Sequence, residues 1–457
     1  MLDILLRHLP IQVLNNINII GGIKLKKFFF GVVLLLLSAS LIACNGGSED
    51  ESGEGKEKAE AKSGEPTTVH FWHALGGKNG ELIDELVENF NNSQDEVEVV
   101  ASFQGGYDEA VTKLQQSISA QSQPEIAMIE RAYVEMFDDS EVLEDLKPYL
   151  DNSGIKESDF VEGLMGHSYF ESGELVSLPF NRSTPILHVN KTMLDEQGLE
   201  VPSSWEELEE VANALIEKDG DEYSRYGLSM PYDTWYPIAM ITQSNGTFFN
   251  DDNSSVGFLD NGVGEEVFSY LKDLQNTGAL FYPPAQDSGN IVNQMFMSEK
   301  IGMMFQSTGT IGTLLETVDF DYVTAFLPQN EKYSTPTGGG NIAMFKDAEN
   351  KEAAWKFIEW MLESEDGIQQ FIIDSGYLPF TYSMVDSQAI QQLWEEEPNR
   401  KVAFEQLEHA VDTNKDVEWP VVMHEFFSAI EAIMYDDEDI TTTLEQFTAE
   451  TERILQK

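Results

Sequence analysis

The fold is decided by residues 68–131, which read TVHFWHALGGKNGELIDELVENFNNSQDEVEVVASFQGGYDEAVTKLQQSISAQSQPEIAMIER. Short apolar runs alternate with amphipathic stretches along this segment. The apolar runs predict strands at 69–72, 97–100 and 124–129. Apolar residues that recur every three or four positions predict helices at 82–90 and 111–118. This alternation predicts an α/β domain with a parallel sheet that helices cover on both faces.

Aromatic and polar residues follow each of the three predicted strands. Trp72-His73 ends the first strand, Gly105-Gly106-Tyr107 follows the second, and Glu130-Arg131 follows the third. Ligands of open α/β sheets bind beyond the carboxyl ends of the strands, so we expect these residues to surround one crevice. His73 either donates to a ligand there or caps the following turn, and we favour the cap.

A second α/β segment begins at about Pro185. It contains a predicted helix that starts at Trp205 and a predicted strand at 226–230, and helices dominate after Ala348. A chain of 457 residues has room for two or three domains, and its hydrophobic share of 41% is ample for a packed core.

The net charge and the cysteine count of the chain exclude one class of partner and two kinds of cross-link. The formal net charge is −54 at pH 7, and only one cysteine is present. Nucleic acids need lysine and arginine to replace the counterions of their phosphates, so we expect no nucleic-acid binding. The single cysteine rules out an intramolecular disulfide and a zinc cluster built from cysteines.

That cysteine belongs to a predicted export signal. A basic segment (KLKK, 24–27) precedes an apolar run (28–37), and LIAC follows at 41–44. This pattern is typical of a bacterial lipoprotein signal, and it predicts that Cys44 becomes the lipidated first residue of the mature chain. The alternative is an uncleaved membrane-spanning helix, for which the run is short. We hypothesise that translation starts at Leu25.

The export signal divides the N-terminal part of the chain into two predicted segments. Residues 1–43 are the leader and signal peptide. Residues 44–67 are rich in glycine, serine, glutamate and lysine and predict a disordered acidic tether.

The signatures of common enzymes are missing from the sequence. We find no Gly-x-Ser-x-Gly elbow, no His-Glu-x-x-His pair and no Walker loop. Trp72 lies at a predicted strand end, Trp235 lies in the predicted loop YDTWY (232–236), and Tyr377 lies in SGYLP (375–379). Aromatic faces at such places either stack on a solute or simply pack in the core. We expect no cofactor and no metal.

Three motifs carry a resemblance to a known family. They are FWH at 71–73, SLPFNRSTP at 177–185 and GYLP at 376–379, supported by PSSWEEL at 202–208. With them the chain resembles the extracellular solute-binding proteins (family 1) of bacterial ABC importers. Within the family it is most similar to the glycerol-3-phosphate-binding group and more distantly to the maltose-binding group.

The resemblance implies the two-lobed periplasmic-binding-protein fold (type II), with a hinged cleft between two α/β domains. It implies that 68–184 and 308–340 form lobe 1, and that 185–307 and 341–457 form lobe 2. Matching motif by motif places ligand contacts on Tyr107, Ser183, Ser307, Gly339 and Tyr377. Trp72 and Trp235 are the expected stacking walls.

Two matches to the family depart from its pattern. The acidic contact expected at or beside Glu130 coincides with Arg131 in an ungapped placement. The arginine that the family uses near its C-terminal helices, where it would grip a phosphate, falls in Lys415-Asp416-Val417, which contains no arginine. Either Arg131 or Lys415 replaces it, or the ligand is not a phosphate.

The sequence therefore predicts a lipid-anchored, monomeric substrate-binding protein of an ABC importer on the outer face of the cell membrane or in the periplasm. It would capture glycerol 3-phosphate, a related glycerophosphodiester or a sugar and deliver it to the membrane permease. The alternatives are a secreted surface hydrolase acting on sugars or phosphodiesters, and an adhesive lipoprotein.

Overall fold

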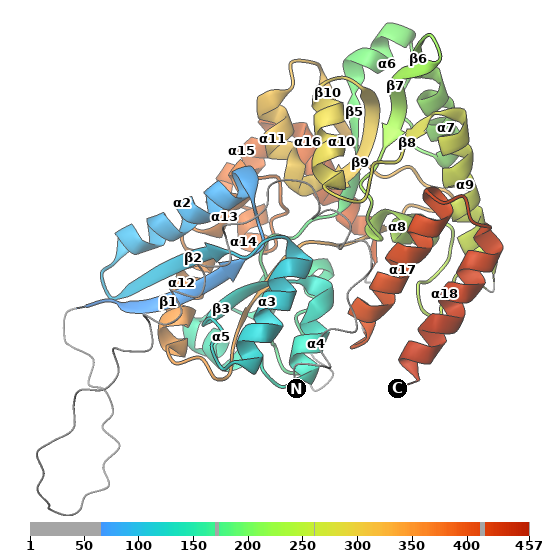
Figure 1. The fold of residues 1–457 in the computed structure, drawn as a ribbon. Coiled ribbons are helices and arrows are strands. Elements are labelled where there is room, and N and C mark those ends of the chain that lie inside the picture. Colours follow the sequence, from blue (N-terminus) through green and yellow to red (C-terminus); the bar gives the residue numbers. More distant parts are fainter. Residues whose placement is uncertain (1–64, 170–172, 260, 412–415, 457) are drawn as a thin grey trace, which may run out of the picture. The chain divides into compact units, whose positions relative to one another are not determined.

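A computed structural model describes residues 65–169, 173–259, 261–411 and 416–456 (Figure 1). In these residues the chain forms two α/β lobes, each around its own sheet. We call the five-stranded sheet with its helices lobe 1, and the six-stranded sheet with its helices lobe 2. The predicted signal peptide, the predicted lipidation site Cys44 and the predicted tether up to residue 64 lie outside the described residues.

The sheet of lobe 1 has the strand order β2-β1-β3-β12-β4. Its strands are β1 (Thr67–His73), β2 (Val97–Phe103), β3 (Ile126–Glu130), β4 (Leu178–Pro179) and β12 (Gly340–Met344). β1 pairs in parallel with β2 and β3, whereas β12 runs antiparallel to β3 and β4. The three strands predicted first are therefore confirmed as a parallel set, inside a sheet that is mixed.

Helices cover both faces of this sheet, as predicted. Between the strands of lobe 1 lie α2 (Gly77–Ser93), α3 (Tyr107–Ser119), η2 (Arg131–Tyr133), α4 (Val134–Asp139), α5 (Lys147–Ser153), η3 (Glu157–Asp159) and η4 (Glu162–Leu164). After β12 follow α12 (Lys351–Glu363), α13 (Ile368–Asp374), α14 (Tyr382–Val385) and α15 (Gln388–Glu396). Phe71 of β1 packs on Phe180 and on Phe357 of α12, with ring centroids 5.9 Å apart in both pairs.

The sheet of lobe 2 has the order β10-β5-β9-β7-β6, with β8 beside β7. Its strands are β5 (Pro185–Asn190), β6 (Glu217–Asp219), β7 (Glu222–Ser229), β8 (Leu280–Phe281), β9 (Ile301–Ser307) and β10 (Tyr322–Ala325). β5 is buried along its whole length because it lies between β9 and β10 inside the sheet. A separate two-stranded sheet joins β11 (Thr335–Pro336) to β13 (Ala410–Val411).

The helices of the remaining chain are α6 (Lys191–Gln197), α7 (Trp205–Ala214), α8 (Trp235–Gln243), α9 (Val263–Thr277), α10 (Ser288–Met297), η5 (Thr308–Thr310), α11 (Ile311–Thr317), α16 (Pro398–Glu405), η6 (Gln406–His409), α17 (Trp419–Met434) and α18 (Ile440–Leu455). α7 begins with a Ser204 side chain that accepts from the backbone N–H of Glu207, a capping arrangement that the sequence PSSWEEL favours. Phe426 of α17 and Phe447 of α18 pack with ring centroids 5.1 Å apart, inside the lobe 2 core.

The expected division of the chain into lobes is wrong after Ser307. β10, expected in lobe 1, pairs with β5 in the sheet of lobe 2, and β12, expected largely in lobe 2, pairs with β3 in the sheet of lobe 1. α12 and α13 then pack on α2 of lobe 1. The physical reason is that the next strand after β9, which is β10, pairs within the same sheet. The chain therefore stays in lobe 2 until Gly338–Gly340, where it crosses to lobe 1, and it returns to lobe 2 near α16.

Two further findings concern membranes and metals. No helix within the described ranges is both long and apolar enough to cross a membrane. The same residues contain no group of three or more His, Cys, Asp and Glu side chains arranged to hold a metal ion.

Candidate functional site

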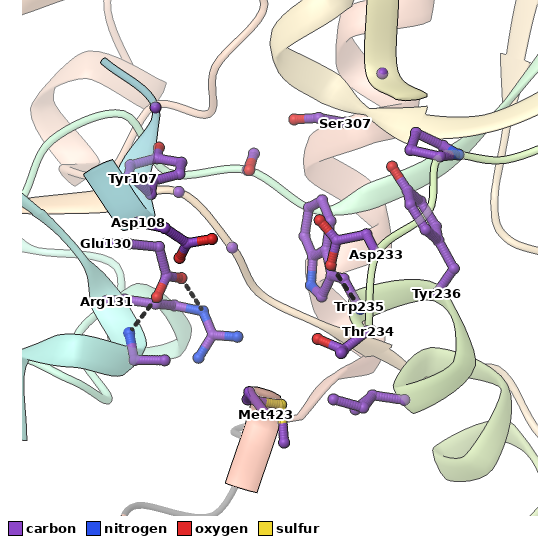
Figure 2. Close-up of a pocket in the computed structure, with 18 of the residues that line it drawn as sticks. Tyr107, Asp108, Glu130, Arg131, Asp233, Thr234, Trp235, Tyr236, Ser307 and Met423 are labelled. Carbon is purple, nitrogen blue, oxygen red and sulfur yellow. Dashed lines mark hydrogen bonds and ion pairs between the residues drawn. The ribbon is translucent and has the colours of Figure 1, made fainter. Parts of the chain in front are cut away.

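A cavity of about 670 Å³ lies between the two lobes at the ends of their strands. Figure 2 shows that Tyr107, Asp108, Glu130 and Arg131 form one wall, and that Asp233, Trp235, Tyr236 and Ser307 face them. Its remaining lining includes Tyr133, Ser183, Tyr232, Ile238, Gly338, Gly339, Tyr377, Trp419, Met423 and Phe427. A space of this size suits a small molecule.

Tyr107 is placed in the cavity by the turn between β2 and α3. Gly105 in this turn has a φ of +96°, which a residue with a Cβ rarely adopts, and Gly106 is the N-cap of α3. The Tyr107 hydroxyl accepts a hydrogen bond of 2.9 Å from Nδ2 of Asn181. Burial raises the pKa of Tyr107 well above its usual value, so the hydroxyl keeps its proton and can donate to a ligand.

Glu130 and Arg131 continue the lobe 1 wall at the end of β3. Glu130 accepts a hydrogen bond of 2.8 Å from the backbone N–H of Ala132, which holds the carboxylate at the start of η2. Burial raises the pKa of Glu130, although the neighbouring Arg131 opposes the shift. The Arg131 Nε lies 3.9 Å from Oε1 of Glu130, so the two opposite charges partly neutralise each other.

A buried chain of polar side chains holds Arg131 from behind. Its NH1 lies 2.8 Å from Nε2 of His167, whose Nδ1 lies 3.3 Å from Glu135. A guanidinium can only donate hydrogen bonds, so Nε2 of His167 accepts and its proton lies on Nδ1, facing Glu135. The arginine is only 4% exposed, and its guanidinium is engaged with His167 and Glu130.

The crossings between lobes bring a serine and two glycines to the cavity. Ser183 and Gly338 exchange backbone hydrogen bonds in both directions, at 3.1 and 2.7 Å. The carbonyl of Gly339 accepts from the backbone N–H of Arg131 at 3.1 Å. Gly339 has a φ of +84°, and a Cβ there would lie 1.9 Å from the carbonyl oxygen of Asn181. Only glycine therefore fits this crossing without a shift of the backbone.

The lobe 2 wall is built from the start of α8. The Asp233 Oδ1 accepts a hydrogen bond of 2.9 Å from the backbone N–H of Trp235. Burial raises the pKa of Asp233 to about 6, and the negative charge of Asp108 adds to the shift. The indole of Trp235 packs on Gly338, where a Cβ would meet its Cζ2 at 2.4 Å.

Ser307 and Tyr377 complete the lining near the crossings. The Ser307 Oγ accepts a hydrogen bond of 3.2 Å from the backbone N–H of Gly309, next to the cavity. The Tyr377 ring stacks on Phe371 with centroids 5.7 Å apart, and its hydroxyl accepts from Asn79 at 3.5 Å. Both residues belong to the lining of the cavity.

The structure brings eight of the predicted site residues together in this lining: Tyr107, Glu130, Arg131, Ser183, Trp235, Ser307, Gly339 and Tyr377. Trp72 is not among the lining residues; it packs, partly buried, on the cluster that contains Val111 and Leu114 of α3. The neighbouring His73 is also outside the lining, with its ring 5.9 Å from that of Phe103. Lys415 lies outside the described residues.

Sequence reasoning missed several lining residues. Asp108 follows the predicted contact Tyr107, and Asp233 lies two residues before the predicted contact Trp235, so proximity in the sequence could have indicated both. Trp419, Met423 and Phe427 recur every four positions, the spacing of one helical face. That spacing predicts a buried stripe, but it does not say that a cavity borders the stripe.

Comparisons with known proteins agree with this architecture. A family model described as "Bacterial extracellular solute-binding protein" matches residues 85–399. The sn-glycerol-3-phosphate-binding periplasmic protein UgpB of Escherichia coli K12 is 24% identical over 360 residues, which cover 75% of this chain and 80% of that protein. The protein of the same name from Agrobacterium fabrum gives the same identity and coverage.

Two solved structures share the fold. The substrate-binding protein Lmo0181 of Listeria monocytogenes, in complex with cycloalternan, has a TM-score of 0.76 and 20% identity, covering 85% of this chain and 98% of that one. UgpB of Mycobacterium tuberculosis, in complex with glycerophosphocholine, has a TM-score of 0.76 and 22% identity at the same coverage. The proteins named in these comparisons bind solutes, and the alternative of a hydrolase finds no support among them.

Proposed function

Since the chain belongs to the family of bacterial extracellular solute-binding proteins, we propose that it is the lipid-anchored substrate-binding protein of an ABC importer. It captures a small polyhydroxylated solute between its lobes and delivers it to the membrane permease. The solute is glycerol 3-phosphate, a related glycerophosphodiester or a sugar, the classes that the relatives' names contain.

The observation that carries the proposal is the cavity lined by both lobes and by the crossings between them. A solute that touches both walls binds the closed arrangement more tightly than the open one, because only the closed arrangement offers both sets of contacts. Binding then shifts the population toward the closed form, which a permease can distinguish from the open form.

The lining supports a polyhydroxylated solute. Hydroxyl groups of Tyr107, Ser183 and Ser307 and the partly buried backbone at Gly339 offer donors and acceptors near the crossings. The Trp235 ring lies opposite and offers an apolar face. A few placed polar groups beside aromatic walls are the usual composition of a small-molecule site.

The proposed location follows from the predicted signal. Cleavage before Cys44 and lipidation of that residue would leave the acidic tether between the membrane and the folded chain. The protein would then work as a monomer on the outer face of the membrane, or in the periplasm, beside its permease.

A thermal-shift screen of the purified chain tests the proposal. Glycerol 3-phosphate, glycerophosphocholine, maltose and longer oligosaccharides are the probes, because a ligand that binds only the native state raises the melting temperature. At least one of them is expected to raise it. Absence of any shift across the panel would contradict the proposal and favour an adhesive lipoprotein.

Two variants test the site within the same screen. Ser183→Ala removes a hydroxyl from the crossing, and Tyr377→Phe removes a hydroxyl while it keeps the stacking on Phe371. Each is expected to weaken binding of the active ligand about tenfold, the effect of about 1.4 kcal/mol from one lost hydrogen bond. Chromatography of the incubated ligand excludes turnover if its amount stays constant.

A further inference from the structure

Most of the side chains that line the lobe 2 half of the cavity are aromatic or apolar. Trp419, Met423 and Phe427 lie four residues apart on α17, so they present one face of that helix to the cavity. Tyr232, in the loop before α8, and Trp235, at the start of α8, line the same half of the cavity. The Tyr232 and Phe427 rings are in contact, with centroids 5.3 Å apart, and Tyr232 donates to the Phe427 carbonyl at 2.7 Å.

A carboxylate lies within this aromatic surface. Asp233 follows Tyr232 in the loop before α8, and the hydrogen bond that it accepts from the Trp235 backbone fixes its position. Figure 2 shows Asp108 and Glu130 on the opposite wall. These three carboxylates act on one another, since Asp233 feels the charge of Asp108, and Glu130 feels the charge of Asp233.

The lining offers little positive charge against these carboxylates. Among the lining residues that the structure describes, Arg131 is the only lysine or arginine. Its guanidinium is already paired with Glu130 and hydrogen-bonded to His167. A carboxylate in a partly desolvated site is costly unless a positive charge compensates it. The lobe 2 half is therefore suited to a group that is cationic and has an apolar surface.

A methylated ammonium group has both properties. Its methyl groups give it an apolar surface, and its charge is attracted to the faces of tryptophan, tyrosine and phenylalanine rings. A dianionic phosphate in the same place would meet Asp233 at close range and would gain nothing from the rings. An uncharged sugar could donate hydroxyl hydrogen bonds to Asp233, but it would bring neither an opposite charge nor the cation–π attraction to the rings.

We propose that the lobe 2 half of the cavity binds a methylated ammonium group of the solute, with Asp233 as its counter-ion and Tyr232, Trp235 and Phe427 around it. The polyhydroxyl part of the same solute then lies near Ser183, Ser307 and Gly339. This inference rests on the proposed function and narrows its solute to one that carries a cationic head.

Calorimetric titration of the full chain tests the inference with matched probes. Glycerophosphocholine carries the ammonium group, and its isostere with a 3,3-dimethylbutyl group in place of choline keeps the shape without the charge. We expect glycerophosphocholine to bind at least tenfold more tightly than this isostere and than glycerol 3-phosphate. Glycine betaine, which has the ammonium group without the polyol, is expected to bind measurably but more weakly.

Two variants assign the effect to Asp233. Asp233→Asn removes the charge and keeps an oxygen that can accept from the Trp235 N–H, so α8 is expected to keep its start. In this variant the preference for glycerophosphocholine over the isostere is expected to fall to about twofold or less. Asp251→Asn removes the same charge from an exposed position outside the lining and is expected to keep the full preference.

The outcomes separate this inference from the proposed function. Equal affinities of glycerophosphocholine and its isostere in the unmodified chain would overturn the ammonium site. Binding of maltose or glycerol 3-phosphate without any preference for glycerophosphocholine would overturn it as well and would leave the proposed function standing. A preference that survives Asp233→Asn would overturn the assignment of the counter-ion. Failure of every probe, sugars included, would overturn both proposals.

Discussion

Replacing Asp233 with asparagine is expected to stabilise the ligand-free protein at neutral pH. Burial and the charge of Asp108 raise the pKa of Asp233 from 3.8 to about 6. The native state therefore holds this proton more tightly than the unfolded state, and the free energy of unfolding falls as the pH rises from about 4 to about 6. A shift of about two pKa units corresponds to about 3 kcal/mol, present in full above pH 6.

Asparagine does not reduce the free energy of unfolding in this way because it carries no charge. Its side-chain oxygen can still accept from the Trp235 backbone, which Asp233 contacts at 2.9 Å. The variant is therefore expected to be about 3 kcal/mol more stable than the unmodified chain at pH 8 and under about 2 kcal/mol more stable at pH 5. A gain in stability with a loss of binding would be typical of a residue kept for function.

Urea unfolding followed by tryptophan fluorescence at pH 8 and pH 5 measures both differences. The Asp251→Asn variant is the control, because an exposed carboxylate is expected to change stability by no more than about 0.5 kcal/mol. Equal stabilities of Asp233→Asn and the unmodified chain at pH 8 would refute the reasoning. A gain that is the same at both pH values would also refute it, because the cost would then not come from ionisation.

The remaining predictions concern other parts of the fold. Gly339→Ala is expected to lower the free energy of unfolding by at least about 2 kcal/mol and to weaken ligand binding, because its Cβ would lie 1.9 Å from the Asn181 carbonyl oxygen and its φ is positive. Urea unfolding measures the first effect, and the thermal shift on adding ligand measures the second. An unchanged urea midpoint would contradict the description of this crossing. Burial lowers the pKa of His188 to about 4 from 6.5, so the native state resists protonation and its stability is expected to fall by up to about 3 kcal/mol as the pH drops from 6.5 to 4. His188→Gln is expected to show a shallower loss between pH 7 and pH 5, and a slope equal to that of the unmodified chain would assign the loss to other groups. Ser183→Ala and Tyr377→Phe are expected to lower ligand affinity about tenfold while the melting temperature of the free protein changes by only a few degrees.

Much of lobe 1 could be predicted from local patterns. The predicted strands at 69–72, 97–100 and 124–129 correspond to β1, β2 and β3, and the two predicted helices lie within α2 and α3. Parallel strands present their carboxyl ends at one edge of a sheet, so Tyr107 and Glu130 could be placed together before any coordinates were known.

The exceptions arise where a residue's position depends on a distant partner. Trp72 ends a strand as predicted, but successive side chains of a strand point to opposite faces, and its own face is covered by Val111 and Leu114 of α3. The membership of β10 and β12 likewise depends on their pairing with β5 and β3, and no periodicity within either strand reveals its partner.

The sequence by itself determined the α/β class, the family motifs and the residues that gather at the strand ends, because each of these follows from local periodicity or from a contiguous motif. Only the tertiary structure decided the character of the cavity. Asp108 and Asp233 belong to different lobes, and their mutual repulsion exists only because the fold sets them on facing walls. The stripe of Trp419, Met423 and Phe427 lines the cavity for the same reason, since packing decides which apolar face borders a space and which fills the core.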